Sequence, residues 1–244
     1  MTRLNKAVWR GGAALATLAM IAGTLSFSQA ADAVQNTRVN FAALVTVGDG
    51  GSHILGNPAA RVTLVEYVSY TCPHCATFSA QSAAVLRERF VAGGGTKVEV
   101  RHIVRDPIDM AMAVAANCGA PARFFSRHEA LMAQQGAILG RVQALPPATL
   151  QAWTAGPIEG RLRRIADGSG VTAWMQGRGF TAVQINQCLA DQGLAQQIFA
   201  MTQAGTAAGV THTPSFAING RLLPASEASN WPTLAAALTA AVRP

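Results

Sequence analysis

The stretch Tyr70-Thr71-Cys72-Pro73-His74-Cys75 lies between an apolar run, Val62–Val68, and a segment of helical character that begins at Ala76. We expect Cys72 to be the helix N-cap, because proline at the first helical position has a suitable φ and lacks only an N–H that would be unpaired anyway. Cys75 then lies one turn further on the same face, within disulfide-bonding reach of Cys72. The helix N-terminus stabilises the Cys72 thiolate, which is the nucleophilic form. The stretch therefore predicts thiol–disulfide exchange chemistry.

The surrounding pattern alternates strand and helix. Val62–Val68 is apolar except at Thr63 and Glu66, which is typical of a strand buried on both faces. A helix is expected from about Cys75 to Val91, ended by three glycines. Further strands are expected at Ser52–Leu55 and at Lys97–Val104, where apolar residues alternate.

A long helical block follows, from Ile108 to about Gly209. Thr181 and Gln184 form a capping-box pair that starts one of its helices. Strands at Ser215–Asn219 and Arg221–Leu223 then flank the hairpin signal Asn219-Gly220, and a last helix is expected over Trp231–Val242. This order predicts an α/β fold with a helical insertion.

Composition excludes some classes of function. The 244 residues are 50% hydrophobic and 13% charged, which is typical of a packed globule and not of a disordered chain. Three of the 19 cations and none of the 12 acids lie in residues 1–30, so the net charge of +7 leaves +4 on the remainder. No basic stripe with interleaved aromatics is present, which argues against nucleic-acid binding.

Residues 1–30 are interpreted as a secretory signal. A basic start precedes an apolar run from Ala13 to Leu25, and Ser28 and Ala30 suit cleavage before Ala31. The run is short for a membrane span; an uncleaved anchor is the alternative. Export implies an oxidising compartment, and we expect a bacterial periplasm.

The chain resembles the DsbA-like branch of the thioredoxin superfamily. The likeness is carried by Cys72-Pro73-His74-Cys75, by Leu64-Val65-Glu66-Tyr67 and by Thr213-Pro214. It covers about residues 51–242 and implies a thioredoxin fold with an inserted helical domain. After a lead-in over 31–50, the thioredoxin-like domain would comprise 51–107 and 209–244, and the insertion 108–208.

The resemblance also implies a function and a set of roles. A DsbA-like protein introduces disulfides into newly exported, cysteine-containing proteins and is reoxidised by a quinone-linked membrane partner. By position, Cys72 would attack, Cys75 would resolve and Pro214 would be the cis proline facing the disulfide. Glu66 would be the buried acid near the resolving sulfur. We expect a monomer without a metal or an organic cofactor; the redox group is the Cys72–Cys75 disulfide itself.

Other interpretations of the two cysteines remain open. A purely structural Cys72–Cys75 bond would close only a short loop and stabilise little; the protein would then be a non-catalytic binding or chaperone module. A zinc site made by all four cysteines would lack a second close-spaced pair. Within thiol chemistry, a disulfide isomerase or a client-specific reductase is the alternative to an oxidase. Thr213 is polar where strong oxidants of the family have an apolar residue, and this weakens the choice of an oxidase over an isomerase.

The roles of the neighbouring residues also have alternatives. His74, beside Cys72, would stabilise the thiolate, and each unit by which the pKa falls corresponds to roughly 30 mV in this two-electron couple; otherwise it is an exposed helix residue. Glu66 would transfer a proton to Cys75, or would pair with Lys97 or Arg101. His212 lies next to Thr213 and could border the site. His53, His102 and His128 are expected to be structural.

The remaining two cysteines suggest a second disulfide. Four cysteines allow three pairings, and proximity joins Cys72 to Cys75, which leaves Cys118 and Cys188. Both lie in the helical block in apolar surroundings. We expect a structural bond between them; two separate buried thiols are the alternative.

Overall fold

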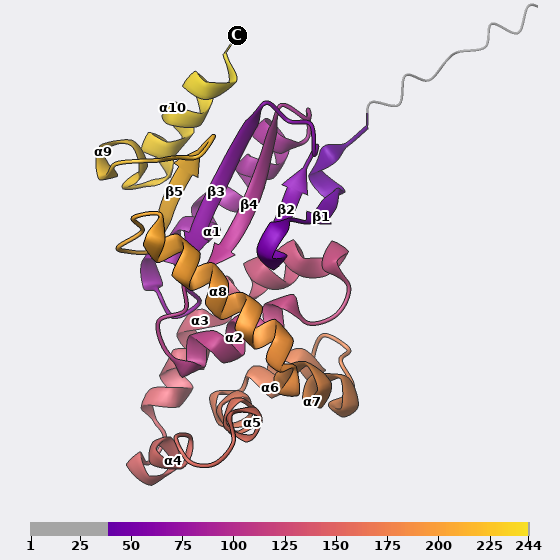
Figure 1. Cartoon of the computed structure of the whole chain (residues 1–244), viewed down its shortest axis with the longest axis vertical. Helices are drawn as coiled ribbons and strands as arrows, with labels where there is room; N and C mark the ends of the chain where they lie inside the picture. The colour runs from indigo at the N-terminus through magenta and orange to yellow at the C-terminus, as the bar shows by residue number, and fades with distance from the viewer. Residues whose placement is uncertain (1–38, 244) are drawn as a thin grey trace, which may run out of the picture. The chain divides into compact units, whose positions relative to one another are not determined.

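The fold is organised on a six-stranded mixed sheet with strand order β1-β2-β4-β3-β5-β6. The computed structural model describes residues 39–243, except for the side chains of 158 and 159. The strands are β1 (Val45–Val47), β2 (His53–Gly56), β3 (Val62–Val68), β4 (Thr96–His102), β5 (Ser215–Ile218) and β6 (Arg221–Leu222). β3 and β4 are parallel, and the other neighbouring pairs are antiparallel (Figure 1).

Helices surround the sheet and fill the connection from β4 to β5. They are α1 (Pro73–Val85), α2 (Pro107–Asn117), α3 (Phe124–Gln143), α4 (Pro147–Ala152), α5 (Ile158–Ser169), α6 (Val171–Gln176), α7 (Ala182–Ala190), α8 (Gln192–Ala207), α9 (Ala225–Ala228) and α10 (Trp231–Val242). Short 3₁₀ turns lie at Phe41–Ala43, Asp49–Gly51 and Pro121–Arg123. Figure 1 shows α4 to α7 gathered at the end of the molecule away from α10. No helix in residues 39–243 is long and apolar enough to cross a membrane.

The central strand β3 separates two apolar clusters. Leu64 and Val68 belong to the main core, together with residues of α1, α3 and α10. Val65 and Tyr67 point to the opposite face, where they cluster with Val210 and Ala217. β3 is therefore buried on both faces, and the strand-to-helix junction starts at the end of this buried strand.

Several predicted elements are confirmed. β3 and α10 have the predicted bounds, and Thr181 and Gln184 form the capping box of α7. At the hairpin between β5 and β6, Asn219 and Gly220 have φ values of 49° and 81°, as a two-residue turn of type I′ requires.

The structure differs most from the predictions in two elements, and β4 also ends at His102 and not at Val104. Val45–Val47, within the expected lead-in, is the edge strand β1, and it pairs with β2; three residues are too few to give a periodic signal. The expected helix over Cys75–Val91 is divided, because α1 ends at Val85 and a π-helical turn continues over Leu86–Val91. The signal peptide or uncleaved anchor expected over residues 1–30 lies outside the described residues.

Helix α8 connects the helical block to the sheet. The Thr202 hydroxyl accepts a hydrogen bond from the Val104 amide at 2.9 Å and donates one to the His102 carbonyl at 3.3 Å. α8 is therefore anchored to the end of β4, although its sequence position falls within the range expected for the insertion, 108–208. Figure 1 shows α8 crossing from the sheet to α6 and α7.

Candidate active site

The Cys72–Cys75 segment forms the junction between β3 and α1. Cys72 is the N-cap, with φ −93° and ψ 114°, and Pro73 occupies the first turn. The Cys75 amide donates to the Cys72 carbonyl at 3.0 Å. This bond closes the first turn of the helix, so Cys75 lies one turn after Cys72. Both cysteines are free thiols, exposed by only 3% and 2%.

The environment of Cys72 favours its thiolate. Its pKa is lowered to about 4, first by the hydrogen bond from the Cys75 thiol and then by hydrogen bonding from the Thr213 side chain and from the backbone N–H groups of Cys75 and His74; burial opposes the shift. In the thiol form, Sγ of Cys72 donates to the Thr213 carbonyl at 3.1 Å. That bond stabilises the thiol form. The hydrogen bonds that the thiolate accepts are more numerous and outweigh it, so the pKa of Cys72 is lowered.

The Cys75 thiol has the opposite character. Its hydrogen bond to Cys72 and its burial raise its pKa well above the ordinary value, and the Ser69 backbone offsets only part of this. A single proton is therefore held by Cys75 while Cys72 ionises. This asymmetry makes Cys72 the better nucleophile and the better leaving group.

A groove beside Cys72 offers room for a substrate chain. The Thr213–Pro214 bond is cis, and the Thr213 carbonyl contacts the Cys72 sulfur. The groove has a volume of about 440 Å³; we call it the active-site groove, and its lining includes His74, Phe78, His212, Thr213, Pro214 and Phe216. The structure therefore brings the expected residues His74, His212, Thr213 and Pro214 to one surface next to Cys72.

The contribution of His74 comes from its backbone. Its side chain is exposed, and the N–H of its main chain, not its imidazole, is among the groups that lower the pKa of Cys72. The ring is left at the edge of the active-site groove, where it can meet a bound chain.

Glu66 of β3 lines a small cavity against α1. Its side chain is 7% exposed, and Oε1 has no hydrogen-bond partner in the described part of the chain. The cavity has a volume of about 30 Å³, and Ser79, Ser82 and Glu129 are among its walls. Burial, and then the charge of Glu129, raise the pKa of Glu66 to about 7.

The expected ion pair of Glu66 with Lys97 or Arg101 is wrong. Lys97 donates to the Pro58 carbonyl at 2.9 Å, and Arg101 pairs with Glu99 at 2.7 Å. Strand register explains the difference, because Glu66 lies opposite Val100 of β4 and not opposite either cation. Neither Glu66 nor Cys75 contributes to the pKa shift of the other, so a proton-transfer role of Glu66 stays a proposal.

Sequence reasoning missed two residues that hold the junction. Gln135 of α3 donates to the carbonyls of Tyr70 and Cys72, at 2.8 and 2.9 Å. Asp109 of α2 accepts bonds from the Ser69 hydroxyl at 2.6 Å and from the Tyr70 amide at 2.7 Å. These partners are 39 to 65 residues from the junction in sequence, and nothing in the local pattern marks them.

Three buried histidines form a cluster behind the junction. The Tyr70 hydroxyl hydrogen-bonds Nδ1 of His128 at 2.8 Å. His53 and His128 stack on Phe124, and His102 meets its edge. Burial lowers the pKa values of His53 and His128 to about 4 and that of His102 to about 3, so these rings are neutral packing groups. Within residues 39–243, no three His, Cys, Asp or Glu side chains are grouped as metal ligands.

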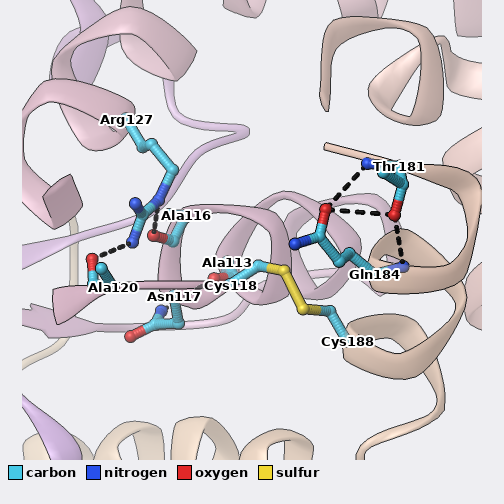
Figure 2. The surroundings of a disulfide bond; sticks show 9 residues. All are labelled: Ala113, Ala116, Asn117, Cys118, Ala120, Arg127, Thr181, Gln184 and Cys188. Carbon is cyan, nitrogen blue, oxygen red and sulfur yellow. Dashed lines mark hydrogen bonds between the residues drawn. A yellow bond between two sulfur atoms is a disulfide. The ribbon is translucent and has the colours of Figure 1, made fainter. Parts of the chain in front are cut away.

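The second cysteine pair forms a disulfide. Cys118, the C-cap of α2, is bonded to Cys188 of α7, with the Cα atoms 5.8 Å apart (Figure 2). The bond joins segments 70 residues apart. Because these sulfur atoms bind each other, the alternative of a zinc site made by all four cysteines is wrong.

Comparison with known proteins identifies the family to which this fold belongs. A family model described as thioredoxin matches residues 49–240. The crystal structure of a protein-disulfide isomerase from Novosphingobium aromaticivorans is 39% identical, with 79% of this chain and 98% of that chain covered and a TM-score of 0.74. The chain belongs to the thioredoxin family. The predicted class, a thioredoxin fold with an inserted helical domain, is thereby confirmed.

More distant relatives support the DsbA-like fold. Wolbachia pipientis α-DsbA1 shares the fold at 16% identity, with a TM-score of 0.62 over 82% of this chain and 94% of that one. A Rickettsia bellii protein, provisionally named as a protein-disulfide oxidoreductase, is 25% identical over 70% of this chain. The match spans only 58% of the Rickettsia protein's length.

Proposed function

We propose that this DsbA-like protein is a thiol:disulfide oxidoreductase that introduces disulfides into exported proteins through Cys72 and Cys75. The observation that carries the proposal is the opposite shift of the two cysteine pKa values at one helix N-terminus, Cys72 down and Cys75 up. A low pKa at Cys72 stabilises the reduced protein and makes its disulfide oxidising. The redox group is this cysteine pair, with no metal or organic cofactor.

The proposed reaction is two successive exchanges at sulfur. A client thiolate attacks Cys72 Sγ of the oxidised pair; the Cys72–Cys75 bond breaks and Cys75 leaves, taking up a proton. The second client thiolate then attacks the client sulfur of the mixed disulfide, and Cys72 leaves as a thiolate. The client loses two electrons and gains a disulfide, and the enzyme gains the two electrons. The depressed pKa of Cys72 favours this second departure.

The active-site groove would hold the client beside Cys72. Its walls combine aromatic surface at Phe78 and Phe216 with the polar groups of His74 and His212. The Thr213 main chain borders the sulfur, so an extended client segment can pair with it as an added strand. Cys72 is only 3% exposed, and we propose that a client sulfur reaches it from the active-site groove, which His74 and Pro214 line.

Glu66 is proposed to supply the proton that the departing Cys75 needs. Its raised pKa, about 7, lets it hold a proton at neutral pH, and it lies on the same side of β3 as α1. Reoxidation requires a two-electron acceptor, which we propose to be a quinone-linked membrane protein. The signal-like residues 1–30 support a periplasmic location.

An isomerase is the second candidate. The Novosphingobium relative is named a protein-disulfide isomerase, and Thr213 is polar where an apolar residue precedes the proline in strong oxidants. Both activities use Cys72 as the reactive sulfur: a client thiolate attacks it in the oxidised oxidase, whereas the Cys72 thiolate of a reduced isomerase attacks a client disulfide.

Two assays on the same protein separate these functions. Stoichiometric oxidised enzyme is mixed with a reduced, unfolded two-cysteine protein, and reduced enzyme with a scrambled-disulfide protein, and correct disulfides are counted by mass. The proposal expects fast transfer in the first assay and its loss in Cys72→Ser. Rapid rearrangement in the second assay with slow transfer in the first would assign an isomerase, and inactivity in both would leave a non-catalytic module.

A further inference from the structure

A cleft rich in arginine lies next to the structural disulfide, between the start of α3 and the segment that leads into α7. We call it the arginine cleft; its volume is about 610 Å³, and its polar lining includes Arg123, Ser126, Arg127, Arg178 and Gln184. No carboxylate is among its lining residues, and none of these residues borders the active-site groove. Nothing in the proposed thiol chemistry uses this cleft.

Arg127 is the central residue of the arginine cleft. It is only 5% exposed, and its guanidinium donates to the carbonyls of Ala116 and Ala120 at 2.8 and 3.2 Å (Figure 2). No side chain that the structure describes pairs with it as an anion, and no described residue accepts a bond from its Nη1. Two backbone carbonyls carry only partial negative charge, so the charge of Arg127, at the wall of the cleft, has no counter-ion among the described side chains.

Two further cations border the same cleft. Arg123 lies one turn before Arg127, and its charge is among the causes that lower the pKa of Arg127. The guanidinium of Arg178, an exposed residue, lies 3.9 Å from the centre of the Trp174 ring, a cation–π contact. The N-termini of α3 and α7 lie at the cleft as well, and helix N-termini carry positive partial charge.

Arg127 is buried, Arg123 and Arg178 are exposed, and no acid lines the cleft to balance the three charges. We propose that the arginine cleft binds a small oxyanion of the carboxylate or phosphate class. The planar donor fork of arginine matches both groups. The anion would accept from the open Nη1 of Arg127 and supply the missing counter-charge. Its binding would be independent of the redox state of Cys72 and Cys75.

Calorimetric titration of the full chain tests this site. The probes are inorganic phosphate and citrate, at constant ionic strength balanced with chloride. We expect saturable binding of at least one probe to the wild type and at least a tenfold loss of affinity in Arg123→Gln/Arg178→Gln. The control is Arg163→Gln, which removes an exposed cation of α5 outside the cleft; its affinity per site should stay within twofold of the wild type.

Arg127→Lys provides a second variant that keeps the charge and removes the fork. If it folds, as judged by circular dichroism, it should bind more weakly than the wild type, because one ammonium cannot replace the bidentate geometry. Preference for phosphate or for citrate assigns the class of anion. Absence of saturable binding of both probes to the wild type would overturn the proposal, and so would equal affinity in wild type and in Arg123→Gln/Arg178→Gln.

Discussion

The thiol of Cys72 donates a hydrogen bond to the backbone carbonyl of Thr213 across 141 residues of sequence, with Sγ and O 3.1 Å apart. This bond joins the start of α1 to the loop before β5, so the nucleophile and the surface that would hold a client form one unit. A thiolate cannot donate. Ionisation of Cys72 therefore frees the Thr213 carbonyl for a hydrogen bond from a client amide.

The Thr213 hydroxyl should tune the acidity of Cys72. Thr213→Val keeps the shape and removes the side-chain hydrogen bond that lowers the pKa of Cys72, so we expect that pKa to rise by about one unit, the scale of one hydrogen bond to a charged group. The reduction potential should fall by roughly 30 mV. Thiolate absorbance against pH measures the first effect and glutathione equilibration the second. Thr211→Val is the control, and equal shifts in both variants would contradict the assignment.

Gln135 should be essential to the stability of the junction. In Gln135→Leu the Tyr70 carbonyl loses its buried donor, whereas the Cys72 carbonyl keeps the amides of Cys75 and Ala76; one unpaired buried group costs about 1–3 kcal/mol. Denaturant unfolding measures the loss. The neighbouring Gln134 is exposed, so Gln134→Leu should change the free energy of unfolding by less than about 0.5 kcal/mol. Similar values for the two variants would show that these bonds do not stabilise the fold.

Glu66 should make stability fall as the pH rises. Its pKa is raised to about 7 in the folded protein from an ordinary 4.5, so the folded state binds more protons between these values. Stability from this group is full below about pH 4.5 and is lost as pH rises through 7. Glu66→Gln should therefore be more stable than the wild type at pH 8, by up to roughly 3 kcal/mol, with no advantage at pH 4.

Unfolding free energies of the reduced proteins at pH 4, 6 and 8 provide the test for Glu66. A constant difference between wild type and Glu66→Gln over this range would show that Glu66 ionises normally. The proposed proton transfer has a separate readout, because Glu66→Gln should slow the release of Cys75 in single-turnover client oxidation. An unchanged rate would remove Glu66 from the mechanism without affecting the roles of Cys72 and Cys75.

The Cys118–Cys188 bond should stabilise the fold without taking part in the exchange chemistry. It closes a 70-residue separation, for which chain entropy gives roughly 4 kcal/mol as an upper-end value. Cys118→Ala/Cys188→Ala should lower the melting temperature and leave the Cys72 pKa within about half a unit. Mass spectrometry of non-reduced peptides verifies the bond in the wild type. Free thiols at both positions in the oxidised protein, or an unchanged melting temperature, would contradict this role.

The sequence predicted the elements whose signals are local. The apolar run of β3, the proline after the Cys72 N-cap, the Thr181 capping box and the Asn219-Gly220 turn all act within a few residues, and each is confirmed. The partners of Glu66 depend on strand register, and those of Tyr70 and Cys72 on helices far along the chain. Such contacts arise only when the core packs, so the Lys97 and Arg101 expectation failed, and Gln135 and Asp109 gave no signal.

The pH dependence of Cys72 ionisation tests the central claim most directly. The reduced protein and its Cys75→Ser variant are titrated by thiolate absorbance, and alkylation with peptide mapping identifies the ionising sulfur. In the wild type we predict a midpoint at about pH 4, carried by Cys72, while Cys75 stays protonated beyond neutrality. A midpoint near 8.5, the ordinary value for cysteine, or alkylation that begins at Cys75, would contradict the account.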